Sequence, residues 1–256
     1  MQRIITVSSF KGGTAKTSTS LNLGAAFANS KQNVLLIDFD AQANLTTGLG
    51  YDPDAKDSLA PVLQGKKTVA DVILPTSHPR LSLIPADTWL ERVEVTEALA
   101  ADRYSHERLR EILKPLKQFD TIIIDTPPSL CWLTESALIA SQFALVAATP
   151  EFYSIKGLQR LSQFMETLAQ RHSLEILGVI LSFWNPRGKS NEAFLNVIEE
   201  TFPGKILNSK VRRDICVSES SIYGKPIFET APKSRAAEDY KALAKELLKR
   251  LKTWPK

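Results

Sequence analysis

The residues from Ser9 to Ser18, Ser-Phe-Lys-Gly-Gly-Thr-Ala-Lys-Thr-Ser, are of types and spacing that could hold phosphate groups. They follow an apolar run at 4–7 that predicts a strand, and they precede an apolar run at 21–28 that predicts a buried helix. A glycine-bearing turn at the start of a helix directs backbone N–H groups and the positive end of the helix dipole at an anion. We expect Lys16 to reach the terminal phosphates and the Thr17 hydroxyl to bind Mg²⁺.

This stretch departs from the ordinary phosphate loop, which has the form G-x-x-x-x-G-K-[ST]. Phe10 and Ala15 stand where that pattern has glycine, and a second lysine, Lys11, precedes the glycine pair. Taken alone, the stretch could also be a Gly-Gly turn with two solvated lysines. The expected nucleotide-binding residues are Lys11, Gly12, Gly13, Thr14, Ala15, Lys16, Thr17 and Ser18.

Two further apolar runs end in aspartate. The run at 34–37 is followed by Asp38-Phe39-Asp40, and the run at 122–124 is followed by Asp125. In an open parallel sheet, ligands bind beyond the carboxyl ends of the strands, so we expect all three motifs at one edge. A single aspartate in such a place is often only a helix cap, but three motifs in this order favour a nucleotide site.

The form K-G-G-x-x-K-T at 11–17 resembles the deviant Walker A motif of the ParA/MinD ATPases. The segment 38–44 resembles their switch I, and 119–128 resembles their Walker B segment. The similarity is greatest to short Soj-like chromosome-partitioning ParA proteins, because the phosphate loop starts by residue 11, and we therefore expect no N-terminal helix-turn-helix domain. The resemblance covers nearly the whole chain and continues through 130–140, 151–161, 218–219 and 224–226.

The resemblance implies a Mg²⁺-dependent ATPase with ATP as its nucleotide, and a role for each site residue. Lys16 and Mg²⁺ would neutralise the β- and γ-phosphates, and Asp125 would orient the hydrated ion beside its ligand Thr17. Asp40 would position and activate the attacking water, whereas Asp38 would serve structure or the outer shell of Mg²⁺. Lys11 would reach across a face-to-face ATP homodimer to the partner's nucleotide.

Most members of the family have glycine where this chain has Ala15. Alanine costs little there if the local φ is negative, and it is strained if φ is positive. Ala41 replaces the usual proline after Asp40, which is a milder change. We therefore expect nucleotide binding to be retained, whereas the loop geometry and the turnover rate depend on the backbone at Ala15.

The composition of the 256 residues, 43% of them hydrophobic, predicts one α/β domain spanning 1–256. The chain has no apolar run of about 18 residues, the length that a membrane span needs. Two cysteines, Cys131 and Cys216, have no metal-binding or redox spacing. Residues 205–256 contain 13 Lys or Arg and 6 Asp or Glu, an asymmetry that favours an anionic partner.

Strand and helix patterns alternate along the chain, which predicts a doubly wound, mostly parallel sheet with helices on both faces. The segment 41–80 is less regular and reads as loops with short helices. The predicted strands are 3–8, 33–38, 81–84, 120–125, 143–148, 176–183 and 205–208; the predicted helices are 16–30, 105–118, 132–141, 154–171, 190–202 and 235–251.

The resemblance also implies that an ATP dimer binds double-stranded DNA without sequence preference and works with a ParB-like centromere-binding partner on the nucleoid in the cytoplasm. One family DNA-binding arginine falls on Arg187, whereas another falls on Cys216 and is missing. Neighbouring cations can compensate, because phosphate contacts need charge more than exact geometry. The expected DNA-binding residues are Arg187, Lys189, Lys210, Arg212 and Arg213.

The basic C-terminal helix raises an alternative function, a MinD-like membrane-associated ATPase that regulates division-site placement. Its lysines and Trp254 are typical of a helix that lies on an anionic membrane. The leucines Leu243, Leu247, Leu248 and Leu251 also recur at helical spacing, which favours docking on the domain. A reductase of the same fold would need cysteines that ligate a metal cluster, and Cys131 and Cys216 are not in such contexts. A metabolic ligase of a similar fold would not need Lys11 or the Asp40 motif, so these residues favour the dimeric switch.

Overall fold

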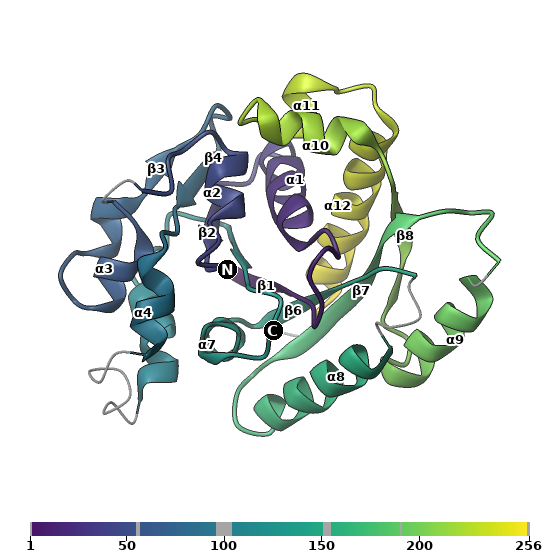
Figure 1. The fold of residues 1–256 in the computed structure, drawn as a ribbon, viewed down its shortest axis with the longest axis horizontal. Coiled ribbons are helices and arrows are strands. Elements are labelled where there is room, and N and C mark those ends of the chain that lie inside the picture. The colour runs from purple at the N-terminus through teal and green to yellow at the C-terminus, as the bar shows by residue number, and fades with distance from the viewer. Residues whose placement is uncertain (1, 55–56, 96–103, 151–154, 190, 255–256) are drawn as a thin grey trace.

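The computed structural model describes residues 2–54, 57–95, 104–150, 155–189 and 191–254. Its described strands form one sheet in the order β3-β4-β2-β5-β1-β6-β7-β8 (Figure 1). Every neighbouring pair is parallel except β3 and β4, so the predicted fold class is confirmed. The strands are β1 (Arg3–Ser8), β2 (Val34–Asp38), β3 (Leu74–Pro75), β4 (Leu81–Ile84), β5 (Thr121–Asp125), β6 (Phe143–Ala148), β7 (Glu175–Trp184) and β8 (Ile206–Arg212).

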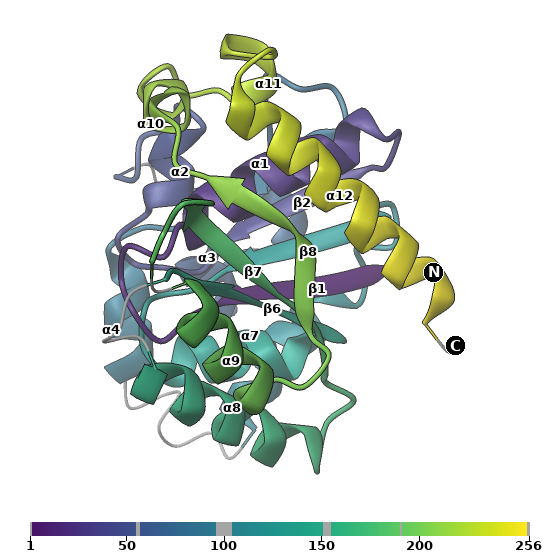
Figure 2. The ribbon, with the colours of Figure 1, turned by 90° about the vertical axis from the view of Figure 1, so that its right-hand side faces the viewer.

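Helices cover both faces of this sheet. In Figure 2, α1 and α12 lie on one face and α7, α8 and α9 lie on the other. The central strands β2, β5 and β6 are buried at every position, as continuous apolar runs between two helical layers require. The α-helices are α1 (Lys16–Asn29), α2 (Asn44–Gly48), α3 (Leu59–Leu63), α4 (Trp89–Val95), α6 (Arg108–Leu113), α7 (Trp132–Ala140), α8 (Ile155–Ala169), α9 (Asn191–Thr201), α10 (Ile215–Ile222), α11 (Ile227–Thr230) and α12 (Arg235–Thr253).

Two predicted elements differ from the structure by several residues. The helix predicted over 105–118 is a 3₁₀ turn, η2 (Ser105–Glu107), followed by α6, which ends at Leu113. Pro115 has no backbone N–H with which to continue the helical hydrogen bonds. The strand predicted over 205–208 is β8 and extends to Arg212. Another 3₁₀ turn, η1 (Val69–Val72), lies in the segment predicted to be irregular. Positions 154 and 190, where two predicted helices were expected to begin, lie outside the described residues.

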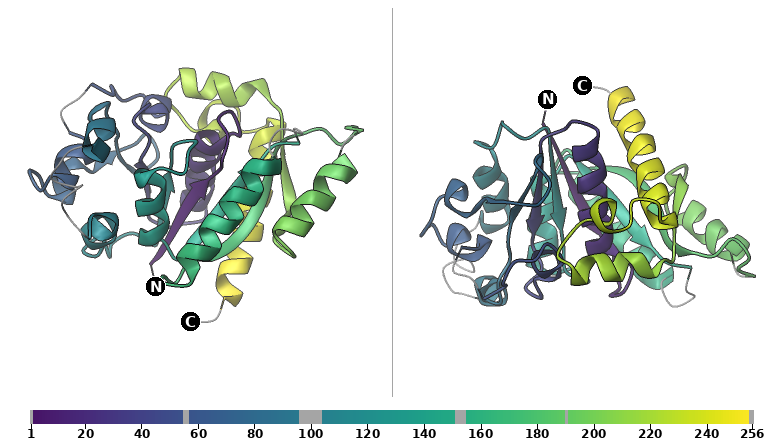
Figure 3. Two further views of the ribbon diagram at one scale, coloured as in Figure 1. Left: turned by 60° about the horizontal axis from the view of Figure 1, so that its bottom comes forward. Right: turned by 90° about the horizontal axis from the view of Figure 1, so that it is seen from above.

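The last helix, α12, docks on the domain, as the leucine spacing predicts. Helix α12 lies beside α1 (Figure 3), and Leu243, Leu247 and Leu251 are buried in the same core cluster as residues of α1. The carboxylate of Glu246 accepts hydrogen bonds of 2.9 and 2.7 Å from the backbone N–H groups of Asn208 and Ser209. The helix thereby satisfies backbone donors of the edge strand β8. In the part of the chain that the structure describes, no helix has the length and apolarity to span a bilayer.

Candidate nucleotide-binding site

The loop between β1 and α1 contains two residues in the left-handed region, Gly13 with φ 74° and Ala15 with φ 63°. Glycine adopts this conformation without steric cost, but the Cβ of an L-residue meets the carbonyl oxygen that follows. Ala15 immediately precedes the first turn of α1, so its backbone sets the angle at which that turn meets the loop. The alanine at this position is therefore strained.

Phe10, which stands where the ordinary phosphate loop has glycine, anchors the loop on α8. A Cβ added at Gly157 of α8 would overlap the Phe10 ring, so only glycine permits this contact. The guanidinium carbon of Arg160 lies 5.8 Å from the centre of the same ring. The loop is therefore held from the side of α8 by an aromatic side chain.

The ammonium group of Lys16 lies inside the site, and its residue is only 7% exposed. It donates a 3.0 Å hydrogen bond to the hydroxyl of Ser9, which also accepts a 2.8 Å bond from Thr14. Burial lowers the pKa of Lys16, while the charges of Asp125 and Asp40 act to raise it. A buried cation between two carboxylates is a suitable partner for polyphosphate, whose charge it meets with little competition from water.

Thr17 and Asp125 face one another across the site, as the sequence motifs predict. The Thr17 hydroxyl donates a 2.7 Å hydrogen bond to one oxygen of Asp125, and Ser20 donates a 2.8 Å bond to the other. Burial raises the pKa of Asp125 to about 6, although both hydroxyls and the Lys16 charge oppose that rise. Ser20 was not among the expected site residues, although it lies one helical turn after Thr17 on the same helix face.

Asp38 stands beside Asp125 in the register of β2 and β5 and is fully buried. One of its oxygens accepts bonds of 2.8 and 2.7 Å from the backbone N–H and hydroxyl of Thr46 in α2. The pKa of Asp38 is raised to about 7, mainly by burial and to a lesser extent by the charge of Asp125. These contacts join β2 to α2, the helix that begins at the end of the switch I segment. Thr46, like Ser20, was not among the site residues expected from the sequence.

Asp40 and Lys11 lie beyond the strand ends. The Asp40 carboxylate accepts a 3.0 Å bond from the backbone N–H of Gln42, and its backbone carbonyl accepts a 2.8 Å bond from Ala43. The backbone carbonyl of Lys11 accepts a 2.9 Å bond from the Ser9 hydroxyl. These bonds position the backbone of both segments, while Gly12 and Gly13 remain exposed at the mouth of the site.

The oxygen atoms of this site fit a hydrated magnesium ion. Mg²⁺ prefers oxygen ligands and usually takes one or two from the protein, the rest coming from water and phosphate. The hydroxyl of Thr17 can supply one such ligand, and the carboxylate of Asp125 beside it can hold water ligands of the ion. Among the described residues no group of three or more His, Cys, Asp or Glu could hold a metal ion by itself. The donor set thus suits an ion that arrives with a nucleotide.

Comparisons with known proteins agree with this geometry. A family model described as "AAA domain" matches residues 2–176. A "ParA family protein" of Chlamydia trachomatis is 65% identical over 248 residues, which cover 96% of this chain and 97% of that protein. The chain belongs to the ParA family. The "Chromosome partitioning protein ParA" of Caulobacter vibrioides is 34% identical, over 97% of this chain and 94% of that protein.

A solved structure extends the family assignment to the fold. The septum site-determining protein MinD of Pyrococcus horikoshii, complexed with Mg-ADP, superposes with a TM-score of 0.81 at 29% identity. The match covers 99% of this chain and 98% of that one. The fold is therefore that of the ParA/MinD-like P-loop NTPases, and the predicted family is confirmed.

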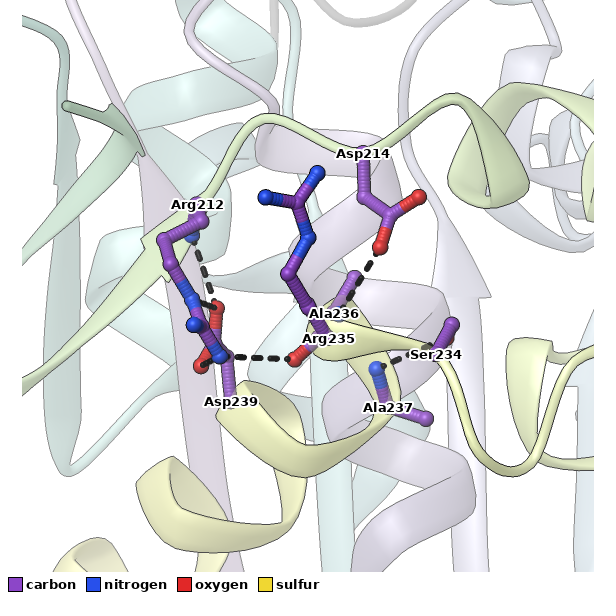
Figure 4. A network of polar contacts seen from close by, with 7 residues as sticks. All are labelled: Arg212, Asp214, Ser234, Arg235, Ala236, Ala237 and Asp239. Carbon is purple, nitrogen blue, oxygen red and sulfur yellow. Dashed lines mark hydrogen bonds and ion pairs between the residues drawn. The ribbon is translucent and has the colours of Figure 1, made fainter.

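Among the cations that the ParA resemblance assigns to DNA, Arg212 is held in an internal ion pair (Figure 4). Its guanidinium donates bonds of 2.9 and 2.7 Å to the two carboxylate oxygens of Asp239, and its backbone N–H donates another of 2.9 Å. These bonds raise the pKa of Arg212 and tie β8 to α12. The geometry gives Arg212 a structural role, because its Nε and one of its Nη atoms bind both carboxylate oxygens of Asp239.

The other assigned cations surround the carboxyl ends of β7 and β8. Arg187 and Lys189 are exposed in the turn after β7, where the backbone N–H of Arg187 bonds the Asn185 side chain at 3.1 Å. The ammonium of Lys210 lies 4.9 Å from the centre of the Trp184 ring. Arg213 is exposed just past β8. These side chains share the sheet edge that holds the phosphate loop, because β1, β6, β7 and β8 run parallel.

Proposed function

We propose that this protein is an ATP-dependent dimerisation switch that partitions chromosome or plasmid DNA. ATP binding drives formation of a homodimer, and the dimer binds double-stranded DNA without sequence preference. A ParB-like centromere-binding partner stimulates slow hydrolysis, which releases the DNA. The family to which the chain belongs, together with the chromosome partitioning name of its Caulobacter relative, supports this role. We accordingly expect a cytoplasmic, nucleoid-associated protein.

The observation that carries the proposal is the 2.7 Å contact of Thr17 with Asp125 beside the buried ammonium of Lys16. Phosphoryl transfer to water needs charge neutralisation and positioning more than covalent help. Magnesium, when bound, supplies a charge that draws electrons from the phosphate oxygens. Thr17 would bind the ion, Asp125 would orient its water ligands, and Lys16 would contact the terminal phosphates.

Asp40 and Lys11 are assigned the two steps that make the site a switch. Asp40 is just outside β2, and its side chain is 8% exposed at the edge where the γ-phosphate would lie, so it would position the attacking water. Lys11 would meet the nucleotide of a second protomer. Two facing nucleotides repel one another, and a lysine supplied by each protomer offsets that repulsion. Dimerisation would therefore require ATP.

Steady-state ATP turnover with Mg²⁺ tests the enzyme assignment. Lys16→Ala should abolish turnover, because the terminal phosphates lose their central cation. Lys66→Ala is the matched control, because Lys66 is an exposed lysine outside the phosphate loop, and this variant should turn over ATP at the wild-type rate. A Lys16→Ala protein that hydrolyses ATP normally would show that the nucleotide site lies elsewhere.

The membrane alternative has little support in the docked C-terminal helix. An amphipathic helix binds a bilayer through its apolar face, and the leucines of that face are buried in the core. Trp254 also packs inward, with its ring centre 5.4 Å from that of Phe143. Removal of residues 241–256 would unfold part of the core, so cosedimentation with anionic vesicles should use the full chain. We expect no binding.

A further inference from the structure

Phe183, near the end of β7, has a backbone conformation that a large side chain rarely adopts. Its φ is 54°, in the left-handed region, where a bulky residue is strained. The strand is irregular there, because Leu181 pairs with Lys210 whereas Trp184 pairs with Arg212. Two residues of β7 thus oppose one residue of β8, which is the pattern of a β-bulge. Strain of this kind persists where the surrounding structure imposes it, and it often marks a functional position.

The bulge leaves an aromatic ring exposed among cations. Phe183 is 40% exposed, and the guanidinium carbon of Arg213 lies 5.7 Å from its ring centre. The neighbouring Trp184 has the Lys210 ammonium at 4.9 Å from its own ring centre. Each cation is therefore held over an aromatic ring at the same end of the sheet.

Positive charge dominates the surroundings of this ring. Besides Lys210 and Arg213, the exposed side chains of Arg187 and Lys189 follow within six residues of Phe183. The nearest acidic residue in sequence to Arg213, Asp214, accepts 3.2 Å bonds from the backbone N–H groups of Cys216 and Ala236. The carboxylate is thus directed at backbone N–H groups, whereas Arg187, Lys189 and Arg213 are exposed.

We infer that Phe183 is an apolar contact to double-stranded DNA, made beside the phosphate contact of Arg213. The inference rests on the proposed DNA-binding function and assigns part of the binding to a residue without charge. A phosphate bound by Arg213 would bring the sugar of the same nucleotide next to the Phe183 ring, 5.7 Å from the guanidinium. Contact with sugars carries no base readout, so it agrees with binding that ignores sequence.

Duplex DNA fits the ring better than single-stranded DNA does. Stacking with an unpaired base needs a free aromatic face. One face of Phe183 lies under the Arg213 guanidinium, so a base could stack on that face only by displacing the cation. An apolar edge beside cations suits the groove wall of a duplex, where phosphates flank sugar carbons.

Fluorescence anisotropy with a labelled 24-base-pair duplex, the full chain and a non-hydrolysable ATP analogue tests the inference over a series of salt concentrations. Phe183→Asn removes the ring but tolerates the left-handed backbone, and Phe183→Gly does so without a side chain. Both should weaken binding about tenfold at every salt concentration, because buried apolar surface is lost, and leave the salt slope unchanged, because no charge is lost. Arg213→Ala should instead reduce the slope by about 1.

Trp89 on α4 is a matched control, because it is also an exposed aromatic, with the Arg92 guanidinium carbon 4.4 Å from its ring centre. It follows β4, which is separated from the β7–β8 pair by four strands of the sheet, so Trp89→Leu should leave DNA affinity unchanged. Melting temperatures near the wild-type value would show that the Phe183 variants are folded. The labelled single strand of the same sequence serves as the second probe.

Each outcome has a defined meaning. No duplex binding by the wild-type protein even at low salt would contradict the proposed function itself. Wild-type binding with equal affinity in the Phe183 variants would overturn only the inference. A reduced salt slope in Phe183→Asn would show that the ring merely positions Arg213, and a loss confined to the single strand would show a base-stacking site. The last two results would also overturn the duplex contact.

Discussion

Asp38 and Asp125 lie side by side at the ends of the neighbouring strands β2 and β5, and both carboxyl groups are fully buried. Two neighbouring carboxyl groups that are both removed from water cost more free energy to ionise together than one does. Their pKa values are raised to about 7 and about 6, and burial is the largest cause for each. A cation bound beside the two carboxyl groups would therefore stabilise their ionised forms.

This pair predicts that the nucleotide-free protein becomes less stable as the pH rises. In the unfolded chain both carboxyls have pKa values near 4, whereas in the folded protein they hold their protons to pH 6–7. Their contribution to the free energy of unfolding is full below about pH 4 and is lost as the pH rises through 6–7. Calorimetry in EDTA should show a lower melting temperature at pH 8 than at pH 5.

Asp38→Asn should flatten this pH dependence, because it removes the group with the higher pKa. We expect the difference in unfolding free energy between pH 5 and pH 8 to shrink by at least about 1 kcal/mol. Asp71→Asn, on an exposed carboxyl, is the control and should leave the profile between these pH values unchanged. An equally steep profile in the Asp38→Asn protein would contradict the assignment.

A second prediction concerns the strained alanine of the phosphate loop. Ala15→Gly should raise the free energy of unfolding by up to about 1 kcal/mol, because glycine adopts a φ of 63° without the steric cost. The gain is limited by the greater backbone freedom of glycine in the unfolded chain. Urea unfolding of the two proteins measures it, and Ala28→Gly, inside α1, is the control that should lose stability. A clear loss of stability in Ala15→Gly would show that the backbone there is not strained.

Arg212 and Arg213 should behave differently although they are adjacent. Arg212→Ala leaves the partly buried Asp239 without its cation and should cost about 1–3 kcal/mol of unfolding free energy. Arg213→Ala removes an exposed side chain and should change stability by less than about 0.5 kcal/mol while weakening DNA binding. Urea unfolding and a DNA titration of each variant separate the two roles. Equal stability of both variants would show that the Asp239 pair contributes nothing.

The strand segments along the chain and the nucleotide loop could be predicted from the sequence because their signals are local. Apolar runs that end in aspartate, and a glycine pair ahead of Lys16, lie within a few consecutive residues. The partner of Asp38 could not be predicted in this way, because Thr46 becomes its neighbour only through the turn into α2. Ser20 could have been predicted as a site residue, because its spacing from Thr17 places both hydroxyls on one face of α1.

Which of the basic side chains are available to a ligand could not be predicted from the sequence. Arg212 and Arg213 are equivalent as charges in the sequence, and both were assigned to DNA. The structure separates them, because Asp239 approaches Arg212 from a helix 27 residues further along the chain. Phe183 had no signal beyond its apolar type, since its exposure depends on how β7 and β8 are paired. Long-range pairing, rather than residue type, decides which of these side chains can meet a ligand.

The most direct test of the switch is the molar mass of the Asp40→Ala protein, measured by size-exclusion chromatography with light scattering in Mg-ATP and in Mg-ADP. The phosphate cradle of this variant is intact while water positioning is lost, so ATP should persist. We predict a dimer of twice the 28.4 kDa chain in ATP and a monomer in ADP. Asp40→Ala combined with Lys11→Ala should stay monomeric in both. The same mass for Asp40→Ala in both nucleotides would contradict an ATP-driven switch.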